Sequence, residues 1–270
     1  MNSSSLCLIL LLALAIDVAA VVQMSAGAEP AAPQARLLVP AYFYPAGKGS
    51  GEWDKLLAAA GEVQIVAIVN PASGPGRRVD PNYAAIFERA AKVKNLTLIG
   101  YVTTSYARRP AAEVNAEVVR WLEFYPGLQG IFFDEQASGR EHVAYQAELY
   151  EHVRTARKLK LVITNPGTTC AEGFVSQPAA DDVCLFEGPK PFDAAPLPDW
   201  AAGYQAERCA ALSYQIESAT VMQKLITAAG ERRIGYCYVT DAAGNNPWNR
   251  LPSYWEAEVK AVKQSSAALR

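Results

Sequence analysis

Residues 128–139 read LQGIFFDEQASG. The apolar run at 131–133 is typical of a buried strand, and it ends abruptly in two adjacent carboxylates, Asp134 and Glu135. A carboxylate held near the end of a buried strand must be solvated, paired or used in chemistry. What these two acids do therefore depends on the fold that surrounds the strand.

Similar apolar runs recur along the chain and alternate with helix-like stretches. The eight candidate strands are 37–45, 63–71, 96–104, 130–135, 159–166, 181–188, 209–216 and 233–241. The helix-like stretches are 83–93, 111–124, 141–157 and 219–229, with 253–264 as a closing helix. Such alternation predicts parallel strands joined by helical crossovers, hence an α/β protein.

Eight units of this kind in about 235 residues favour a single (β/α)8 barrel of the TIM type. An open doubly wound sheet fits the same periodicity. The link between 188 and 209 is rich in proline and poorly helical, so we expect the barrel to be irregular between strands six and seven.

The N-terminal segment has a different character. The apolar run LCLILLLALAIDVAAVV precedes Ala26-Gly27-Ala28, which fits a signal-peptidase site. We expect a signal peptide at 1–28, a short leader at 29–35 and the barrel at 36–270, in a protein that is secreted, periplasmic or on the cell surface. The mature form would then have no membrane span. An uncleaved anchor is the alternative, because MNSSS lacks Lys and Arg and Asp17 interrupts the run.

Composition excludes several classes of function. The chain is 51% hydrophobic, which excludes disorder, and its formal net charge of −2 offers no basic face for nucleic acid. The glycine-rich stretches at 73–76 and 242–246 lack the spacing that cradles phosphates, so we interpret them as rim loops and expect no nucleotide.

Histidine and cysteine usage narrows the chemistry further. The two histidines, His142 and His152, lie in one helix-like stretch, which supports neither a Ser-His-Asp triad nor a zinc site. We expect no metal and no cofactor. Beyond the signal segment we expect one or two disulfides in an exported chain, whereas Cys184 and Cys237, which lie within strand-like runs, are typical of ordinary buried thiols. The four cysteines are Cys170, Cys184, Cys209 and Cys237.

Polar side chains gather where the predicted strands end. In a (β/α)8 barrel the functional face lies at these C-terminal ends. Carboxylates, amides and tyrosines that meet on one rim resemble a sugar site, and Trp248 offers a stacking face, unless it only packs under the last loop. The candidate residues are Tyr42, Asn70, Tyr101, Asp134, Glu135, Asn165, Glu187, Tyr214, Asp241 and Trp248.

Paired carboxylates indicate glycoside hydrolysis, in which one acid protonates the leaving oxygen and the other attacks the sugar or activates water. Asp134 or Glu135 with Glu187 is the natural pair. We assign Asp134 as nucleophile or charge stabiliser and Glu187 as acid/base, because an apolar approach at 185–186 disfavours the charged form of Glu187. In the rival scheme Asp134 orients a substrate N-acetyl group that itself attacks, and Glu135 is the acid. Rim ion pairs of these acids with Arg140 and Lys190 are the structural alternative.

Eight segments, in order and spacing over about 37–262, together resemble the spherulin-4-like family. They are LLVPAYFYP, IVAIVNPASGPG, GYVTTSYARR, GIFFDEQAS, VITNPGT, VCLFEG, ALSYQI and YCYVTDAAGNNPWNRLPSYW. The resemblance implies a secreted or surface-associated (β/α)8 glycoside hydrolase, with catalytic acids at Asp134, Glu135 and Glu187. Members of that family cleave α-1,4-linked galactosamine-containing exopolysaccharides.

The expected function is therefore that of an exported, endo-acting hydrolase of an amino-sugar polymer, with α-1,4-linked galactosamine or N-acetylgalactosamine as its substrate. A non-catalytic carbohydrate-binding or cell-surface matrix protein on the same barrel is the alternative. A polysaccharide is the expected partner in both cases.

Overall fold

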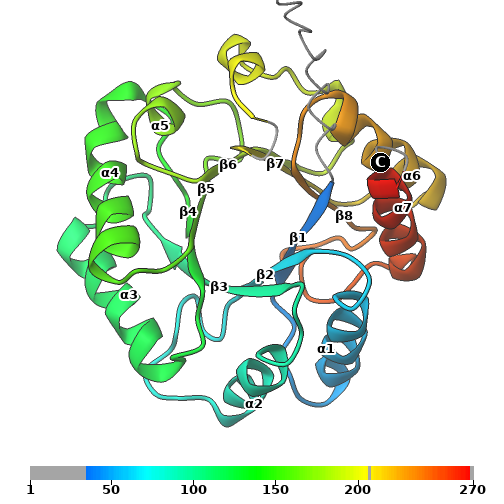
Figure 1. Cartoon of the computed structure of the whole chain (residues 1–270), viewed down its shortest axis with the longest axis horizontal. Coiled ribbons are helices and arrows are strands. Elements are labelled where there is room, and N and C mark those ends of the chain that lie inside the picture. The colour runs from blue at the N-terminus through cyan, green and yellow to red at the C-terminus, as the bar shows by residue number, and fades with distance from the viewer. Residues whose placement is uncertain (1–34, 206–207, 268–270) are drawn as a thin grey trace, which may run out of the picture. The chain divides into compact units, whose positions relative to one another are not determined.

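A closed barrel of eight parallel strands forms the centre of the protein (Figure 1). The computed structural model describes residues 35–205 and 208–267. The strands are β1 (Arg36–Ala41), β2 (Ile65–Val69), β3 (Leu96–Thr103), β4 (Gly130–Asp134), β5 (Leu161–Asn165), β6 (Asp182–Gly188), β7 (Cys209–Ser213) and β8 (Tyr236–Val239). Because β1 pairs with β8 through Arg36 and Tyr236, the predicted barrel is confirmed and the open sheet is excluded.

Helices surround the strands (Figure 1). They are α1 (Lys48–Ala59), α2 (Pro81–Ala90), α3 (Ala111–Phe124), α4 (Val143–Glu151), α5 (Gly173–Ser176), α6 (Ala219–Glu231) and α7 (Trp255–Ala267). Each predicted helical stretch is helical, although 141–157 divides into a 3-10 turn, α4 and a π-turn at His152–Ala156. The sequence pattern does not identify α1, which contains two glycines and has no side-chain cap at Gly47.

The link between β6 and β7 is irregular, as predicted. Within its described residues the helical elements are two 3-10 turns, Phe192–Ala194 and Asp199–Gly203. A second, smaller hydrophobic core lies under this link and includes Phe174, Val183 and Ala201. The link therefore covers this side of the barrel with buried side chains and short turns, where a (β/α)8 barrel usually has a helix.

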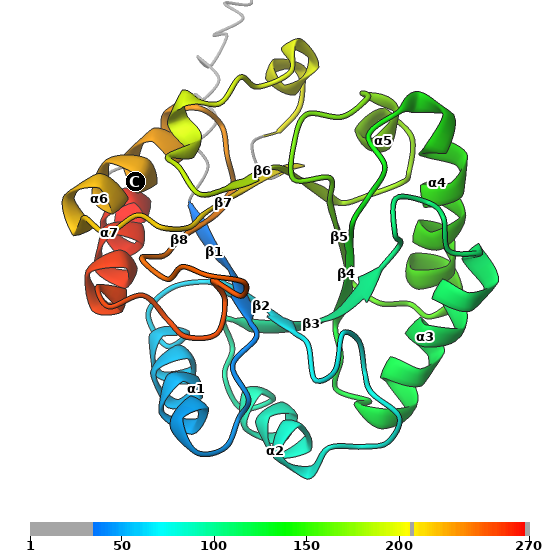
Figure 2. The same ribbon diagram turned by 180° about the vertical axis from the view of Figure 1, so that it is seen from behind.

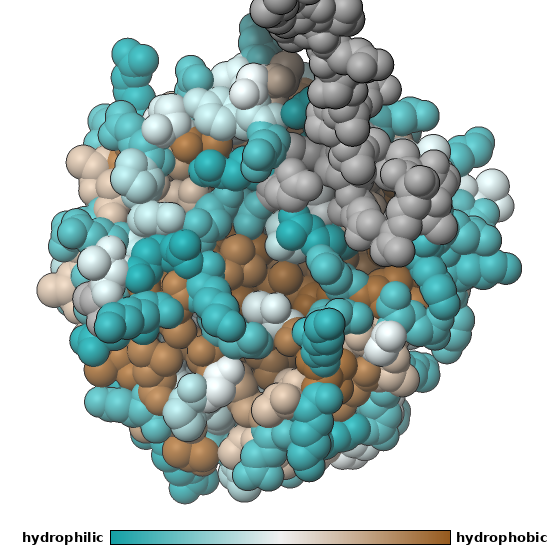
Figure 3. Space-filling model, viewed as in Figure 1, coloured by the Kyte–Doolittle hydropathy of each residue, from teal (hydrophilic) through white to brown (hydrophobic). Residues whose placement is uncertain are grey.

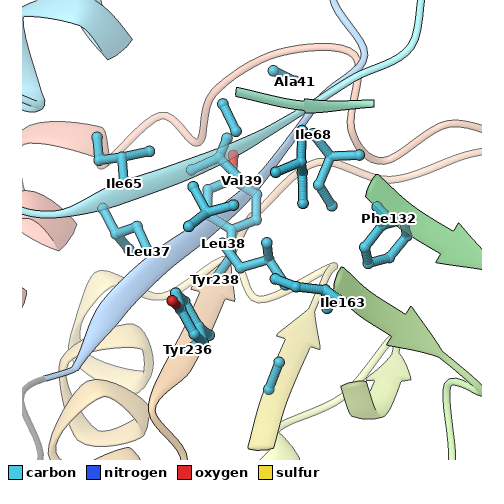
Figure 4. Packing of buried hydrophobic residues seen from close by; sticks show 14 of the residues in the cluster. Leu37, Leu38, Val39, Ala41, Ile65, Ile68, Phe132, Ile163, Tyr236 and Tyr238 are labelled. Atoms are coloured by element: carbon cyan, nitrogen blue, oxygen red, sulfur yellow. The ribbon is translucent and has the colours of Figure 1, made fainter. Parts of the chain in front are cut away.

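The main core fills the barrel with aliphatic and aromatic side chains (Figure 4). Ile68, Phe132 and Ile163 belong to this cluster and lie on β2, β4 and β5. Because side chains alternate along a strand, the residue two positions further on faces the same interior, one layer nearer the C-terminal end. The residues at these positions are Asn70, Asp134 and Asn165. On the face viewed in Figure 1, hydrophobic residues gather around the barrel axis and hydrophilic residues surround them (Figure 3).

Helix α3 packs closely on β3 and thereby positions Tyr101. A Cβ atom at Gly100 would lie 2.7 Å from the Trp121 ring, so only glycine permits this approach. The Trp121 indole N–H donates a hydrogen bond of 3.0 Å to the Tyr101 carbonyl oxygen. The backbone of β3 at Tyr101 is therefore held in place by α3, which fixes the starting point of the Tyr101 side chain.

All four cysteines of the described barrel are buried free thiols, and the expected disulfides are absent from this part of the chain. Cys184 and Cys237 belong to the main core, which confirms the buried-thiol interpretation for these two. Cys170 and Cys209 belong to the smaller core. Burial raises the pKa of the Cys170 thiol to about 12.

The predicted signal peptide (1–28) and all of the predicted leader (29–35) except its last residue lie outside the described residues. Among the residues that the structure does describe, no helix combines the length and the apolar character needed to cross a bilayer. The same residues hold no group of three or more His, Cys, Asp or Glu side chains arranged for a metal ion.

Candidate active site

A pocket of about 430 Å³ opens at the C-terminal ends of the strands. The loop between β8 and α7 turns inward over this end of the barrel (Figure 2). Seven of the ten predicted site residues line the pocket, whereas Glu135, Asn165 and Asp241 lie outside its lining. The lining residues are Tyr42, Asn70, Tyr101, Asp134, Glu187, Tyr214, Gly244, Asn245, Asn246, Pro247 and Trp248.

A larger hollow of about 690 Å³ lies between α1 and α7. Its charged side chains are surface residues, and two of them, Glu62 and Lys263, form an ion pair of 2.8 Å. The barrel pocket is the better candidate site because two partly buried acids, Asp134 and Glu187, line it.

Asn165 joins the two acids of the pocket. Its side-chain nitrogen Nδ2 donates hydrogen bonds to Asp134 Oδ1 at 2.8 Å and to Glu187 Oε2 at 2.5 Å. These two oxygens therefore lie no more than about 5.3 Å apart, the sum of the two distances. The side-chain oxygen Oδ1 of Asn165 accepts from the Gly167 N–H at 2.9 Å, so the orientation of the side-chain amide is fixed.

Asp134 is partly buried but well supplied with donors. Burial raises the pKa of its carboxyl group, while the Glu135 backbone N–H, the Tyr101 hydroxyl and the Asn165 amide donate hydrogen bonds that counteract the rise. The charge of Glu135 raises this pKa further, and the net shift is upward. Three donors directed at one carboxylate suit a group that carries charge during reaction.

The environment of Glu187 also disfavours its charged form. Burial raises the pKa of its carboxyl group, and the nearby charge of Asp134 raises it further. Two donors counteract this effect, the Asn165 amide and the Trp248 indole N–H. Glu187 therefore holds its proton to higher pH than an ordinary glutamate.

Trp248 is only 6% exposed, and its ring packs edge-to-face against Tyr214 with the ring centroids 5.6 Å apart. Its indole lies close enough to Glu187 to counteract the rise in the pKa of that acid, and the stacking of a sugar on its face stays a prediction. Its backbone carbonyl also accepts from the Tyr42 N–H at 3.2 Å, which ties the β8–α7 loop to β1.

Glu135 follows Asp134 in a left-handed backbone conformation, with φ of 53°. Its carboxylate oxygen Oε2 accepts a hydrogen bond of 2.5 Å from the Thr103 hydroxyl. It lies outside the pocket lining but close enough for its charge to influence Asp134. Within the described residues no ion pair joins it to Arg140, and none joins Glu187 to Lys190.

Asp241 braces the loop that covers the pocket. Its Oδ1 accepts from Arg250 Nη1 at 2.8 Å and from the Ser253 N–H at 3.1 Å. These hydrogen bonds hold the pKa of the Asp241 carboxyl below its usual value, against the effect of burial. The other predicted amide, Asn70, lines the pocket, and its Oδ1 accepts from the Gly74 N–H at 2.9 Å.

Sequence reasoning interprets 242–246 as a rim loop and misses that 244–247 line the pocket. The available signal is a polar GNN turn directly before Pro247 and Trp248, at the end of the last strand. Gly244 has φ of 90°, a value that disfavours other residues and lets the chain turn back over the barrel.

Comparisons with known proteins agree with this architecture. The family model described as spherulation-specific family 4 matches residues 36–262. Spherulin-4 of Physarum polycephalum is 30% identical over 238 residues, which cover 84% of this chain and 70% of that protein. The crystal structure of Aspergillus clavatus Sph3 in complex with GalNAc superposes with a TM-score of 0.73 at 24% identity, and covers 86% of this chain and 98% of the other.

Proposed function

The chain belongs to spherulation-specific family 4, the family of spherulin-4, and from this premise we propose that it is an exported glycoside hydrolase of amino-sugar polymers. One observation carries the proposal: Asp134 and Glu187 share a hydrogen-bond donor at the floor of an open pocket. Two acids so close, both partly desolvated, are the machinery that glycosidic bond cleavage requires.

An amino-sugar substrate is supported by the solved relative, whose structure holds GalNAc. We infer an endo-acting enzyme on α-1,4-linked galactosamine or N-acetylgalactosamine. The hydroxyl groups of Tyr42 and Tyr214 and the amides of Asn70 and Asn245 line the pocket and provide donors and acceptors for sugar hydroxyl and N-acetyl groups.

In the proposed reaction the Glu187 carboxyl donates its proton to the glycosidic oxygen while that bond breaks. The Asp134 carboxylate attacks the anomeric carbon and forms a glycosyl ester. Glu187, now ionised, removes a proton from water, which attacks the anomeric carbon, breaks its bond to the Asp134 oxygen and releases the Asp134 carboxylate. Tyr101 and Asn165 hold the Asp134 carboxylate in position throughout.

The first test is hydrolysis itself. We expect the barrel domain to release reducing ends from galactosamine-containing polymers and none from a neutral glucan of similar length. Endo-action should appear as a rapid fall in polymer size before small sugars accumulate. Binding of the amino-sugar polymer without any release would instead identify the non-catalytic matrix or carbohydrate-binding protein.

Stereochemistry is a second expected result. Retaining glycosidases place their carboxyl groups about 5–5.5 Å apart, whereas inverting enzymes need about 6.5–9.5 Å to admit a water molecule. The separation of Asp134 Oδ1 and Glu187 Oε2 is at most about 5.3 Å, which is too short for the second range. We therefore expect the first product to retain the α configuration, observed by proton NMR immediately after cleavage. A β product would contradict the assignment of Asp134 as nucleophile.

The rival scheme also gives retention, so a different measurement separates the two. If the substrate N-acetyl group attacks and Glu135 is the acid, a fully de-N-acetylated polymer cannot be cleaved. We expect such a polymer to remain a substrate. The carboxylate of Glu135 is held by Thr103 outside the pocket lining, which supports Glu187 as the acid.

A further inference from the structure

The exposed large hydrophobic residues of the described chain all follow strands at the functional end of the barrel. There are three, Tyr44, Val79 and Tyr106, and they follow the C-terminal ends of β1, β2 and β3. Their side chains therefore border the same end of the barrel as Asp134 and Glu187. Loops at this end of a (β/α)8 barrel carry the binding residues, so an exposed side chain there is a candidate for ligand contact.

Tyr106 differs from the other two in its backbone. Ser105, Tyr106 and Ala107 are consecutive left-handed residues, with φ of 48°, 57° and 62°. One such residue is uncommon and three in succession are energetically unfavourable, so the surrounding structure must hold them. Unfavourable conformations of this kind persist chiefly at ligand sites.

The turn is held by the strand that carries the acids. The Tyr106 N–H donates to the Glu135 carbonyl oxygen at 2.7 Å, and the Thr104 hydroxyl donates to the same oxygen at 2.8 Å. The Thr104 N–H donates to the Asp134 carbonyl oxygen at 2.9 Å. The position of Tyr106 is thus coupled directly to the C-terminal end of β4.

The side chain of Tyr106 is 50% exposed, and its ring lies 5.7 Å from the Arg108 guanidinium carbon. Its hydroxyl group has no hydrogen-bond partner among the described residues. Tyr44 has a similar exposure, but its hydroxyl bonds to Asp80 at 3.0 Å and Asn82 at 2.8 Å, which tie it to α2. Of these two exposed tyrosines, only Tyr44 has its hydroxyl group engaged by neighbouring side chains, so the Tyr106 side chain is the one available to a ligand.

We propose that Tyr106 forms a sugar-binding subsite beside the catalytic pocket, where its ring stacks on the apolar face of a further pyranose unit of the same polymer chain. A pyranose has a face of C–H groups and a rim of hydroxyls, so it suits an aromatic ring with the Arg108 guanidinium beside it. The polymer then leaves the pocket over the edge between β3 and β4. This inference rests on the proposed function, because it requires a polymeric sugar in the pocket.

Tyr106→Ala should raise KM for a long amino-sugar polymer about tenfold and leave kcat within about twofold, because a lost aromatic contact weakens binding of the whole chain. Tyr106→Asn should do the same, and asparagine tolerates the left-handed backbone, so this variant separates loss of the ring from loss of the turn. Tyr106→Phe should behave as the wild type. A substrate too short to extend beyond the pocket should be cleaved equally by all four proteins.

Val79→Ala is the matched control, because Val79 is 45% exposed on the same rim but has no ring. It should leave KM unchanged. Wild-type KM values for Tyr106→Ala and Tyr106→Asn on the long polymer would overturn the subsite while leaving the hydrolase intact. If the wild type binds the polymer without cleaving it, the same comparison is made by affinity electrophoresis in polymer-containing gels, with the same tenfold criterion. Failure of the wild type both to bind and to cleave overturns the subsite together with the proposed function.

Discussion

Glu187→Gln is expected to lower kcat on an amino-sugar polymer by about 10³- to 10⁴-fold, with little change in KM. Glutamine retains the shape and the hydrogen bond to Asn165 but carries no proton that it can transfer. Because burial and the Asp134 charge raise the pKa of Glu187, the wild type holds its proton to higher pH than an ordinary glutamate. The alkaline limb of the activity profile should disappear with this substitution.

Two controls separate catalysis from folding. Glu123→Gln, at an exposed position of α3, should leave kcat unchanged. A carboxyl whose pKa is raised on folding stabilises the fold in acid and loses that contribution as the pH rises through the raised value. Glu187→Gln should therefore unfold at the same temperature as the wild type or a higher one at neutral pH. Turnover within tenfold of the wild type would exclude Glu187 as the acid.

An activated aryl glycoside sharpens the assignment. Its leaving group departs without protonation, so the first step no longer needs an acid. The Glu187→Gln substitution should therefore slow the first step much less with the aryl substrate than with the polymer. An equal loss on both substrates would point to a structural role for Glu187.

The fold was predictable because parallel strands buried on both faces appear as uninterrupted apolar runs. The same feature explains the limits of the prediction. The first run was predicted to extend to residue 45, since Tyr42 and Phe43 are good strand formers, yet β1 ends at Ala41. The two glycines of α1 lower its helix propensity, and burial of Trp53 and Leu56 against the barrel offsets this cost. Helix propensity alone does not reveal that burial.

The sequence pattern predicted which residues lie at the strand ends near the site, but it did not predict what each side chain does there. Seven residues placed on the rim by the pattern do line the pocket. Asn165 was expected to bind sugar, yet both of its N–H groups are used by the acids. Asp241 was expected there too, yet Arg250 and Ser253 engage its carboxylate. An amide or a carboxylate can form hydrogen bonds with a ligand or with a neighbouring protein group, and the sequence pattern does not show which of the two it meets.

Asn165→Leu is the second substitution with a large expected effect, since one nitrogen supports both acids. Leucine has a similar volume but no donor, so Asp134 and Glu187 each lose a hydrogen bond that lowers their pKa. We expect kcat to fall about 10²- to 10³-fold, the range seen when a preorganised donor is removed. Asn82→Leu, in α2 and outside the pocket, is the matched control and should retain wild-type kcat.

The pH profile distinguishes this role from simple loss of packing. Asp134 must be ionised to attack, and its pKa rises when the Asn165 donor is removed, so the acidic limb of kcat should move to higher pH. Repacking around a leucine would lower kcat at every pH without moving that limb. An unmoved acidic limb would therefore show that Asn165 only fills space, whereas an upward shift would show that the two carboxylates depend on it for their charge.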